Sequence, residues 1–369
     1  MTTGIQSVGY IDLNIMRLDH RRTYHELLQL RKDKFAAHEK ILVNNTDQDF
    51  YYHDCKVGFL LHNFLTMVYR ADISLSNLVF FTLNNQLMQS IEPFVTHDHD
   101  RPEVHTILVS KITHAHIKPM LHESAVLPKD LLYTGLCMMG TPREHRTLLM
   151  QYLMGHDLLD KVQTCMASPG NPTQSTPPVL IGNVPQHMDF DQLNLVFSQP
   201  PFTVESWTKP LTNHSLRLIA SLPAVHQYIN PVIPPTGFEF YRYYAVDIVT
   251  ETNFHYPGQF ITEKTLRPLL MRTPFVMFGS QNFLKNLHDR GFETFHDIWD
   301  ESYDSIADPQ ERLVRCCEIT KQVVSWSLDH WQYIYNKIND RLDHNRRHLL
   351  HYINHELIPL AEKYQYPFP

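Results

Sequence analysis

The stretch that decides the fold runs from Phe260 to Asp304 and reads FITEKTLRPLLMRTPFVMFGSQNFLKNLHDRGFETFHDIWDESYD. Within it, the charged pair Glu263-Lys264 follows a threonine that can cap a helix, and the apolar run PFVMFG ends in glycine. Another apolar run precedes this stretch and closes on a threonine, Glu251 and a second threonine. Carboxylates and a lysine are therefore expected at strand ends, which is where open α/β folds bind nucleotides.

Strand and helix patterns alternate along the chain and predict an α/β fold with two Rossmann-like domains. Strand patterns cover residues 40–44, 77–83, 104–110, 131–139, 179–181, 245–249 and 274–278, and helix patterns cover residues 57–70 and 143–154. A chain of 369 residues exceeds one typical core, so two domains are expected, at residues 1–125 and 126–308. A long helical tail, residues 309–369, is expected to pack back across both domains, since it carries apolar residues at helical spacing.

The composition is that of a globular protein, with 43% hydrophobic and 19% charged residues. The net charge of −7 argues against a protein that coats nucleic acid, although a local basic face remains compatible with it. No apolar run approaches the ~20 residues of a membrane span, and the N-terminal residues lack the features of a signal peptide. The five cysteines show no CxxC spacing and suit reduced thiols, so a cytoplasmic protein is expected.

The segment Thr262-Glu263-Lys264 predicts a charged helix start. Thr262 can cap the helix, and Glu263 and Lys264 then lie in its first turn. A carboxylate there can accept both hydroxyls of a ribose, and a lysine can neutralise a diphosphate beside the free backbone N–H groups. A capped helix with a solvated lysine is the simpler interpretation of the segment alone. The flanking strands favour the binding interpretation.

Two further stretches offer charged groups at the same edge. Arg143 and Arg146 lie three apart in GTPREHR, after an apolar strand, and guanidinium groups suit phosphate oxygens. Glu251 ends a strand, where it can bind a ribose or the donor sugar. The alternative is an exposed first helical turn with ordinary arginines, and a carboxylate that caps a loop.

The segment FITEKTLRPLLMRTPFVMFGS resembles the donor-binding segment of GT-B glycosyltransferases, particularly the α-1,3-fucosyltransferase type with its TEK-containing helix. The longer pattern PFVMFGSQNFLKNLHDRGFETFHDIWDESYD is similar to glycosyltransferase-like proteins of bacteriophages and marine bacteria. The resemblance implies a GT-B-like fold in which Glu263 contacts the nucleotide ribose and Lys264 the phosphates. It covers residues 131–312 in scattered blocks and has no clear counterpart of the fucosyltransferase acceptor domain.

The resulting hypothesis is a glycosyltransferase, hexosyl or pentosyl, that uses a nucleotide-sugar co-substrate and no cofactor. The second domain would bind the donor, and the first an acceptor that is a glycan or DNA. Metal-independent transfer is expected because no DxD motif follows a strand of the second domain; Asp189-Phe190-Asp191 follows a His-Met loop instead. The catalytic base is expected in the first domain, where the candidates are Asp98, Asp100, Asp12, His97 and His99.

Three rival interpretations remain open. The basic residues between Arg17 and Lys40 could hold DNA in a phage enzyme that glycosylates hydroxymethylated bases, although a solvated amphipathic helix is simpler. The histidines His97, His99, His105, His114 and His116 could support a metal-dependent hydrolase, but their spacing fits no zinc signature. A non-catalytic nucleotide-binding or virion protein would keep the sheets without a base. The acidic stretch WDESYD, which ends the opening segment, mainly predicts a structural turn that caps helices, and a catalytic role is the less favoured alternative.

Overall fold

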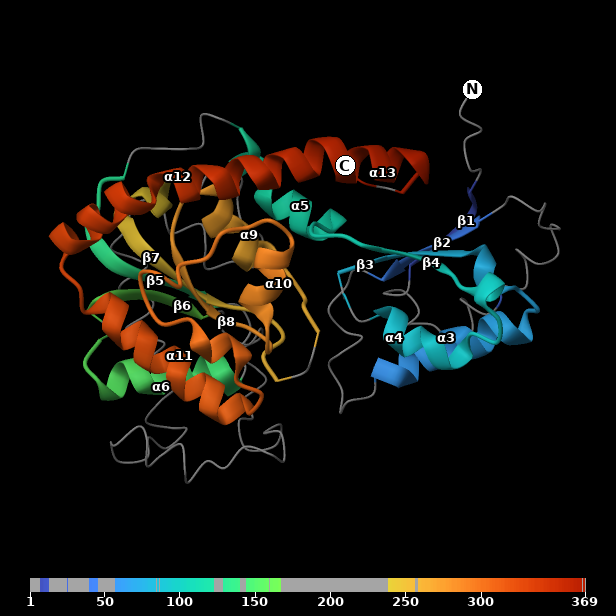
Figure 1. The fold of residues 1–369 in the computed structure, drawn as a ribbon, viewed down its shortest axis with the longest axis horizontal. Helices are drawn as coiled ribbons and strands as arrows, with labels where there is room; N and C mark the ends of the chain where they lie inside the picture. Colours follow the sequence, from blue (N-terminus) through green and yellow to red (C-terminus); the bar gives the residue numbers. More distant parts are fainter. Residues whose placement is uncertain are drawn as a thin grey trace, which may run out of the picture. The chain divides into compact units, whose positions relative to one another are not determined.

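The computed structural model describes residues 7–12, 25, 40–45, 57–83, 85, 87–122, 129–139, 144–158, 160–166, 238–255, 258–366 and 368. The chain forms two compact units. The first comprises Met1–Ala115, Tyr256–Thr262 and Leu350–Pro369, and the second His116–His255 and Glu263–Leu349. Each unit contains a parallel sheet with helices (Figure 1), which confirms the predicted α/β class. The predicted division of binding roles at residue 125 stays a prediction.

The first unit contains a four-stranded parallel sheet in the order β1-β2-β3-β4. Its strands are β1 (Ser7–Asp12), β2 (Lys40–Asn45), β3 (Leu78–Thr82) and β4 (Glu103–Thr106). Its helices are α3 (Val57–Arg70), α4 (Leu87–Ile91) and most of α5 (Lys111–Ile117). Within the described residues, the first unit has short 3-10 helices at Leu75–Asn77, Glu92–Phe94 and Asp98–Asp100, and the second unit has them at Lys118–Leu121, Phe238–Tyr243 and Ser302–Ser305.

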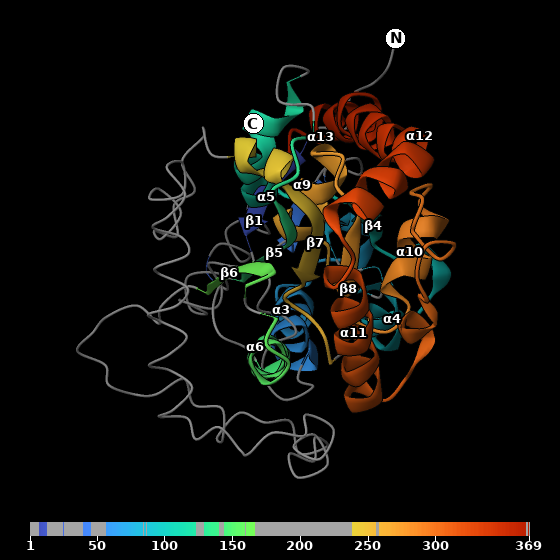
Figure 2. The same ribbon diagram turned by 90° about the vertical axis from the view of Figure 1, so that its left-hand side faces the viewer.

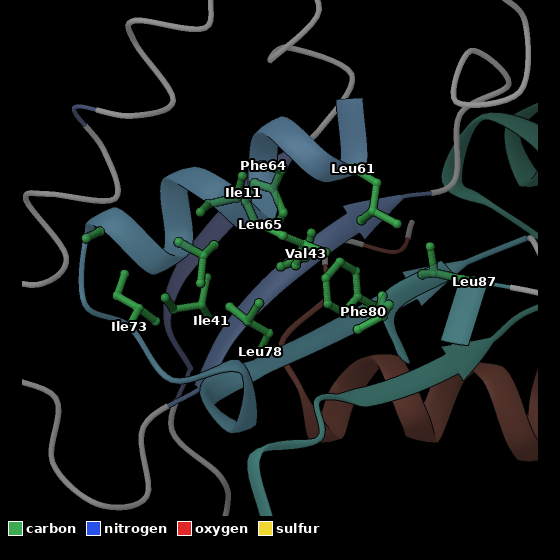
Figure 3. Packing of buried hydrophobic residues seen from close by; sticks show 13 residues of the cluster. Ile11, Ile41, Val43, Leu61, Phe64, Leu65, Ile73, Leu78, Phe80 and Leu87 are labelled. Atoms are coloured by element: carbon green, nitrogen blue, oxygen red, sulfur yellow. The ribbon is translucent and has the colours of Figure 1, made fainter. Parts of the chain in front are cut away.

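Side chains alternate across this sheet and bury both of its faces. On one face, α3 and α4 pack against the strands through a buried apolar cluster that includes Val43, Phe64 and Phe80 (Figure 3). On the other face, the ring of Tyr366 stacks on Phe81 at 4.4 Å between centroids. The last residues of the chain are therefore part of the core of the first unit.

The second unit contains a four-stranded parallel sheet in the order β6-β5-β7-β8. Its strands are β5 (Tyr133–Met139), β6 (Val162–Met166), β7 (Tyr244–Thr250) and β8 (Phe275–Phe278). Its helices are α6 (Glu144–Gly155), α9 (Glu263–Leu270), α10 (Phe283–Asp289), α11 (Pro309–Val324) and α12 (Leu328–Tyr352). β7 and β8 are buried along their full length, as expected for a parallel sheet covered on both faces.

Helices cover the second sheet from both sides, with α6 and α11 below and α9 and α12 above in Figure 1; Figure 2 shows the same layers from the side. On the α11 side, a Cβ added to Gly135 would lie 3.2 Å from the side chain of Val324, so glycine permits this close packing. On the α12 side, Tyr335 donates a 2.9 Å hydrogen bond to the carbonyl of Ala245. These contacts hold the strands in a three-layer arrangement.

The long C-terminal helix is confirmed, and it continues into a π-helical turn (Ile353–Leu357) and α13 (Ile358–Lys363). The predicted helix at residues 57–70 agrees with α3 at both ends. The strand patterns at 40–44, 77–83, 131–139, 245–249 and 274–278 correspond to β2, β3, β5, β7 and β8. The fourth strand of the first sheet is shorter than the expected 104–110, and β1 and β6 were not predicted as strands. Residues 179–181, the Asp189–Asp191 motif and most of the basic segment lie outside the described residues.

Candidate functional site

The topology of the second sheet creates a switch point between two neighbouring strands. β5 is followed by α6 and then β6 on one side, whereas β7 is followed by α9 and then β8 on the other side. The connections that leave the carboxyl ends of β5 and β7 therefore run in opposite directions. In open α/β sheets, ligands bind in the crevice at such a point. The residues that follow these two strands define the candidate site.

Two buried residues at the start of α6 bind the end of β7. Arg146 donates from Nη2 to the carbonyls of Thr250 at 2.8 Å and Glu251 at 3.3 Å. His145 Nε2 lies 2.9 Å from the same Glu251 carbonyl. Because a carbonyl can only accept, the Nε2 of His145 carries the proton in this bond. Burial lowers the pKa of Arg146 to about 10 against the opposing effect of Glu251 and Glu263, so the guanidinium stays charged at neutral pH.

The Glu251 side chain joins the end of β7 to the first turn of α9. Its Oε1 accepts a 2.6 Å hydrogen bond from the hydroxyl of Thr265, and its Oε2 accepts the backbone N–H of Thr252 at 3.1 Å. Glu251 and Thr265 are both fully buried. A buried carboxylate needs such donors, because an ionised group without them is costly to remove from water. These bonds fix the start of α9 against the sheet edge.

Glu263 and Lys264 form a partly buried ion pair at the first residues of α9. Lys264 Nζ lies 2.8 Å from Glu263 Oε1, and their side chains are 11% and 18% exposed, respectively. Burial would raise the pKa of Glu263, but Lys264 and Arg267 outweigh it and hold that pKa well below its usual range. The carboxylate is therefore ionised throughout the neutral range. This pair presents both a negative and a positive group to a ligand at the helix start.

His116 and Arg267 complete the charged cluster, and neither was predicted as part of it. The pKa of His116 is lowered, mainly by burial and also by the positive charges of Arg267 and Lys264. The negative charge of Glu263 opposes this shift. His116 is thus neutral at pH 7, and its buried Nδ1 has no hydrogen-bond partner among the described residues. Arg267 is 5% exposed, and its positive charge acts to lower the pKa of both Glu263 and Asp247. No local sequence pattern links His116 to α9, because His116 and Glu263 are 147 positions apart in the sequence (263 − 116).

Two further residues, Arg143 and Thr262, were predicted to belong to the donor site. Arg143 lies outside the described residues. Thr262 is 2% exposed, directly precedes α9 and belongs to the first unit.

The predicted catalytic carboxylates lie in the first unit. Asp12 ends β1, and its side chain is outside the described part of the chain. Asp98 and Asp100 lie in one 3-10 turn at the surface. Asp98 accepts a 3.2 Å hydrogen bond from Arg101 Nε, and Asp100 accepts one of 3.0 Å from the Thr96 hydroxyl. A role as base stays a prediction for each of them.

The histidine-rich segment that motivated a metal site contains stacked rings, since the centroids of His97 and His99 lie 5.3 Å apart. No group of three or more His, Cys, Asp or Glu side chains able to hold a metal ion is found within the described ranges. Over the same ranges, no helix has the length and apolar character needed to cross a membrane.

The acidic stretch at residues 299–304 forms the predicted structural turn. Asp304 accepts the backbone N–H groups of Leu284 at 2.8 Å and Lys285 at 2.9 Å, and so caps the start of α10. Trp299 is buried against Phe295. The buried guanidinium of Arg312 donates to the carbonyls of Phe254 and Gly279, the loops that follow β7 and β8.

Comparison with known proteins adds little. No family model matches the chain, and no curated protein matches its sequence. The chain is similar to the solved structure of α,α-trehalose 6-phosphate synthase from Burkholderia multivorans at 10% identity and a TM-score of 0.41, over 94% of this chain and 76% of that one. An α,α-trehalose-phosphate synthase (UDP-forming) from Burkholderia vietnamiensis gives 10% identity and a TM-score of 0.40, over 94% and 78%.

Proposed function

We propose that the chain is a glycosyltransferase of GT-B type that binds a nucleotide-diphosphate sugar at the carboxyl edge of the second sheet. The observation that carries this proposal is the convergence of Arg146, Glu251 and the Glu263-Lys264 pair at the switch point between β5 and β7. Such a point is where open α/β sheets hold nucleotides. The TEK segment that resembles fucosyltransferases falls at this place in the fold.

Each charged group has a distinct part in the proposed donor site. Glu263 stays ionised and can accept hydrogen bonds from the two ribose hydroxyls. The Lys264 side chain is 11% exposed at the first turn of α9, and its ammonium can contact the diphosphate. Arg146 is buried, so it would favour the departing diphosphate as a fixed nearby positive charge rather than by direct contact. Glu251 holds the start of α9, and with it the Glu263-Lys264 pair, in position.

The proposed reaction is a direct transfer. A carboxylate of the first unit, for which Asp98, Asp100 and Asp12 are the candidates, accepts the proton of the acceptor hydroxyl. The hydroxyl oxygen then bonds to the anomeric carbon while the bond from that carbon to the diphosphate breaks. The diphosphate leaves with the electron pair and is stabilised by the cations of the second unit. We propose that no metal or other cofactor takes part.

The experiment that tests this proposal measures nucleotide release from a panel of UDP-, GDP-, ADP- and dTDP-sugars, with and without a chelator. Turnover of one donor that is unaffected by chelator supports the proposal. Three variants separate the roles. Glu263→Gln should weaken nucleotide binding, whereas loss of the base, tested in Asp98→Asn and in Asp100→Asn, should lower kcat by about 10²–10⁴-fold and leave nucleotide binding unchanged. Absence of turnover with intact nucleotide binding would instead favour the non-catalytic alternative.

The acceptor is a finer part of the proposal. Transfer to hydroxymethylated bases in DNA, in a phage-encoded enzyme, rests on the basic residues between Arg17 and Lys40 and on the phage-type resemblance. Duplex DNA binding that weakens steeply with salt would support it, because phosphate contacts release counterions. Salt-independent or absent DNA binding would favour a glycan acceptor. A cytoplasmic location is proposed on the sequence features alone.

A further inference from the structure

A polar pocket lies at the amino-terminal edge of the second unit's sheet, opposite the edge that carries the candidate site. It has a volume of about 430 Å³ and is lined mainly by polar residues, among them Lys129, Arg272, Tyr335, Asn336 and Gln332. Lys129 precedes β5, Arg272 precedes β8, and Tyr335 bonds to the second residue of β7. Because the strands are parallel, this pocket and the proposed donor site are at opposite ends of the sheet.

The ammonium group of Lys129 contacts two hydrogen-bond acceptors and one aromatic ring. Its Nζ donates to the carbonyl of Tyr241 at 2.9 Å and to the hydroxyl of Thr273 at 2.7 Å, and it lies 5.3 Å from the centre of the Tyr335 ring. An ammonium has three N–H donors, so one remains for a further acceptor. Burial, and then the charge of Arg272, lowers the pKa of Lys129 to about 7, while Asp247 acts in the opposite direction.

Arg272 is held beside the pocket in an unusual conformation. Its φ of 53° lies in the left-handed region, which residues other than glycine rarely adopt. Its Nη2 donates to Asn339 at 2.6 Å, and its Nε lies 2.8 Å from a carboxylate oxygen of Asp343. Its Nη1 has no hydrogen-bond partner in the part of the chain that the structure describes. The two in-plane N–H groups of Nη1 therefore have no acceptor within the described ranges.

The carboxylates near these two cations are already engaged. Asp343 is paired with Arg272, and Asp247 accepts a 2.9 Å hydrogen bond from the hydroxyl of Tyr241. Burial raises the pKa of Asp247 to about 7, so part of its negative charge is lost at neutral pH. The donors without an acceptor consequently belong to Lys129 and Arg272. The exposed side-chain amides of Gln332 and Asn336 add further N–H donors to the lining of the pocket. This set of groups recognises negative charge.

We propose that this pocket is a second binding site, which takes a small molecule through a phosphate or carboxylate group held between Lys129 and Arg272. The anion accepts the remaining N–H of Lys129 and the Nη1 donors of Arg272. The volume of about 430 Å³ leaves room for a hydroxyl-bearing body against Asn336, Gln332 and the Tyr335 ring. The site is independent of the proposed donor site.

Calorimetric titration of the full chain with sulfate, as a stand-in for a phosphate group, and separately with acetate tests the proposal, with chloride at matched ionic strength as reference. The informative variant is Asn336→Asp, an exposed residue of α12, where the added charge should weaken anion binding by about tenfold or more. Gln322→Glu, which adds the same charge to an exposed position of α11, should leave binding unchanged. Whichever anion binds wild type more tightly identifies the group that the pocket takes.

Two further measurements separate this site from the donor site. Lys264→Met should retain the sulfate binding that Asn336→Asp weakens, whereas loss of all sulfate binding in Lys264→Met but not in Asn336→Asp would place the anion at the donor site and overturn the inference. At about pH 8, sulfate binding should take up protons, because a bound anion raises the pKa of Lys129 from about 7. Titration in buffers of different ionisation enthalpy measures this uptake. Failure of both sulfate and acetate to bind wild type would also overturn the inference of a second site, whatever the outcome for nucleotides.

Discussion

Thr265 donates a 2.6 Å hydrogen bond from its hydroxyl to Oε1 of Glu251, and both residues are fully buried. The bond joins the first turn of α9 to the residue that directly follows β7. It therefore positions the Glu263-Lys264 pair relative to the sheet edge. The position of both charged groups in the candidate site thus depends on the buried carboxylate of Glu251.

Removal of the Thr265 hydroxyl should destabilise the second unit and weaken ligand binding at its carboxyl edge. Thr265→Val keeps the shape of the side chain but deprives the buried carboxylate of a donor, which costs about 1–3 kcal/mol in the free energy of unfolding. Thr265→Ser keeps the hydroxyl and serves as the control. Denaturant unfolding of the three proteins measures the difference. Equal stability of the Val and Ser variants would show that the bond contributes little.

The charge of Glu263 should contribute to stability in a pH-dependent way. Its pKa in the folded protein is held well below the ordinary value of 4.5, so its contribution is present above about pH 4.5 and is lost as the pH falls through the folded pKa. Glu263→Gln should therefore be less stable than wild type at neutral pH, and this difference should shrink on acidification. Glu362→Gln, at an exposed position of α13, is the control. A difference that is constant from neutral to acidic pH would contradict the assigned ion pair.

Glu301 should have the opposite pH dependence. Burial raises its pKa to about 7, against the N–H of Phe295, which lies 3.0 Å from Oε1. The folded state thus binds more protons than the unfolded state between about pH 4.5 and pH 7, and wild type loses stability as the pH rises through this window. Glu301→Gln removes this titration, so the variant should gain stability relative to wild type as the pH rises. Parallel stability curves for the two proteins would refute the assignment.

Arg312 should be among the most sensitive positions of the second unit. Its guanidinium is 2% exposed and donates to the carbonyls of Phe254, Gly279 and Ile306. Arg312→Met fills similar volume but leaves these carbonyls without a donor, which should cost roughly 2–5 kcal/mol. Arg315→Met, on the exposed part of the same helix, should cost less than about 1 kcal/mol, since exposed ion pairs contribute little. Thermal unfolding distinguishes the two, and similar losses for both would argue against a special role for Arg312.

The sequence predicted elements whose signal is local. The helix at residues 57–70 was correct at both ends because a mostly apolar segment of that length exceeds most strands. The buried strands β7 and β8 were found for the related reason that they are short, apolar and followed by polar residues or glycine. By contrast, β6 reads VQTCM and has no apolar run, so only its pairing with β5 makes it a strand.

In the candidate site, too, the sequence predicted only the features whose signal is local. Glu251 was expected directly after a strand and Glu263 at a helix start, and both lie there in the structure, while their role in binding stays a prediction. His116, which faces Glu263 from another segment of the chain, was assigned only to a metal set. The bond from Thr265 to Glu251 and the cap of α10 by Asp304 connect residues 14 and 20 positions apart. No periodicity encodes such contacts.

The measurement that tests the central claim most directly is a thermal-shift screen of wild type and Lys264→Met against UDP, GDP, ADP, CMP, dTDP and their common sugar conjugates. The account predicts that one nucleotide family raises the Tm of wild type by several degrees, since a ligand at ~100 times its Kd stabilises by about 2.7 kcal/mol. The shift should be largely lost in Lys264→Met, while Lys337→Met, an exposed position of α12, keeps it. No shift with any nucleotide, or an equal shift in Lys264→Met, would contradict the proposed donor site.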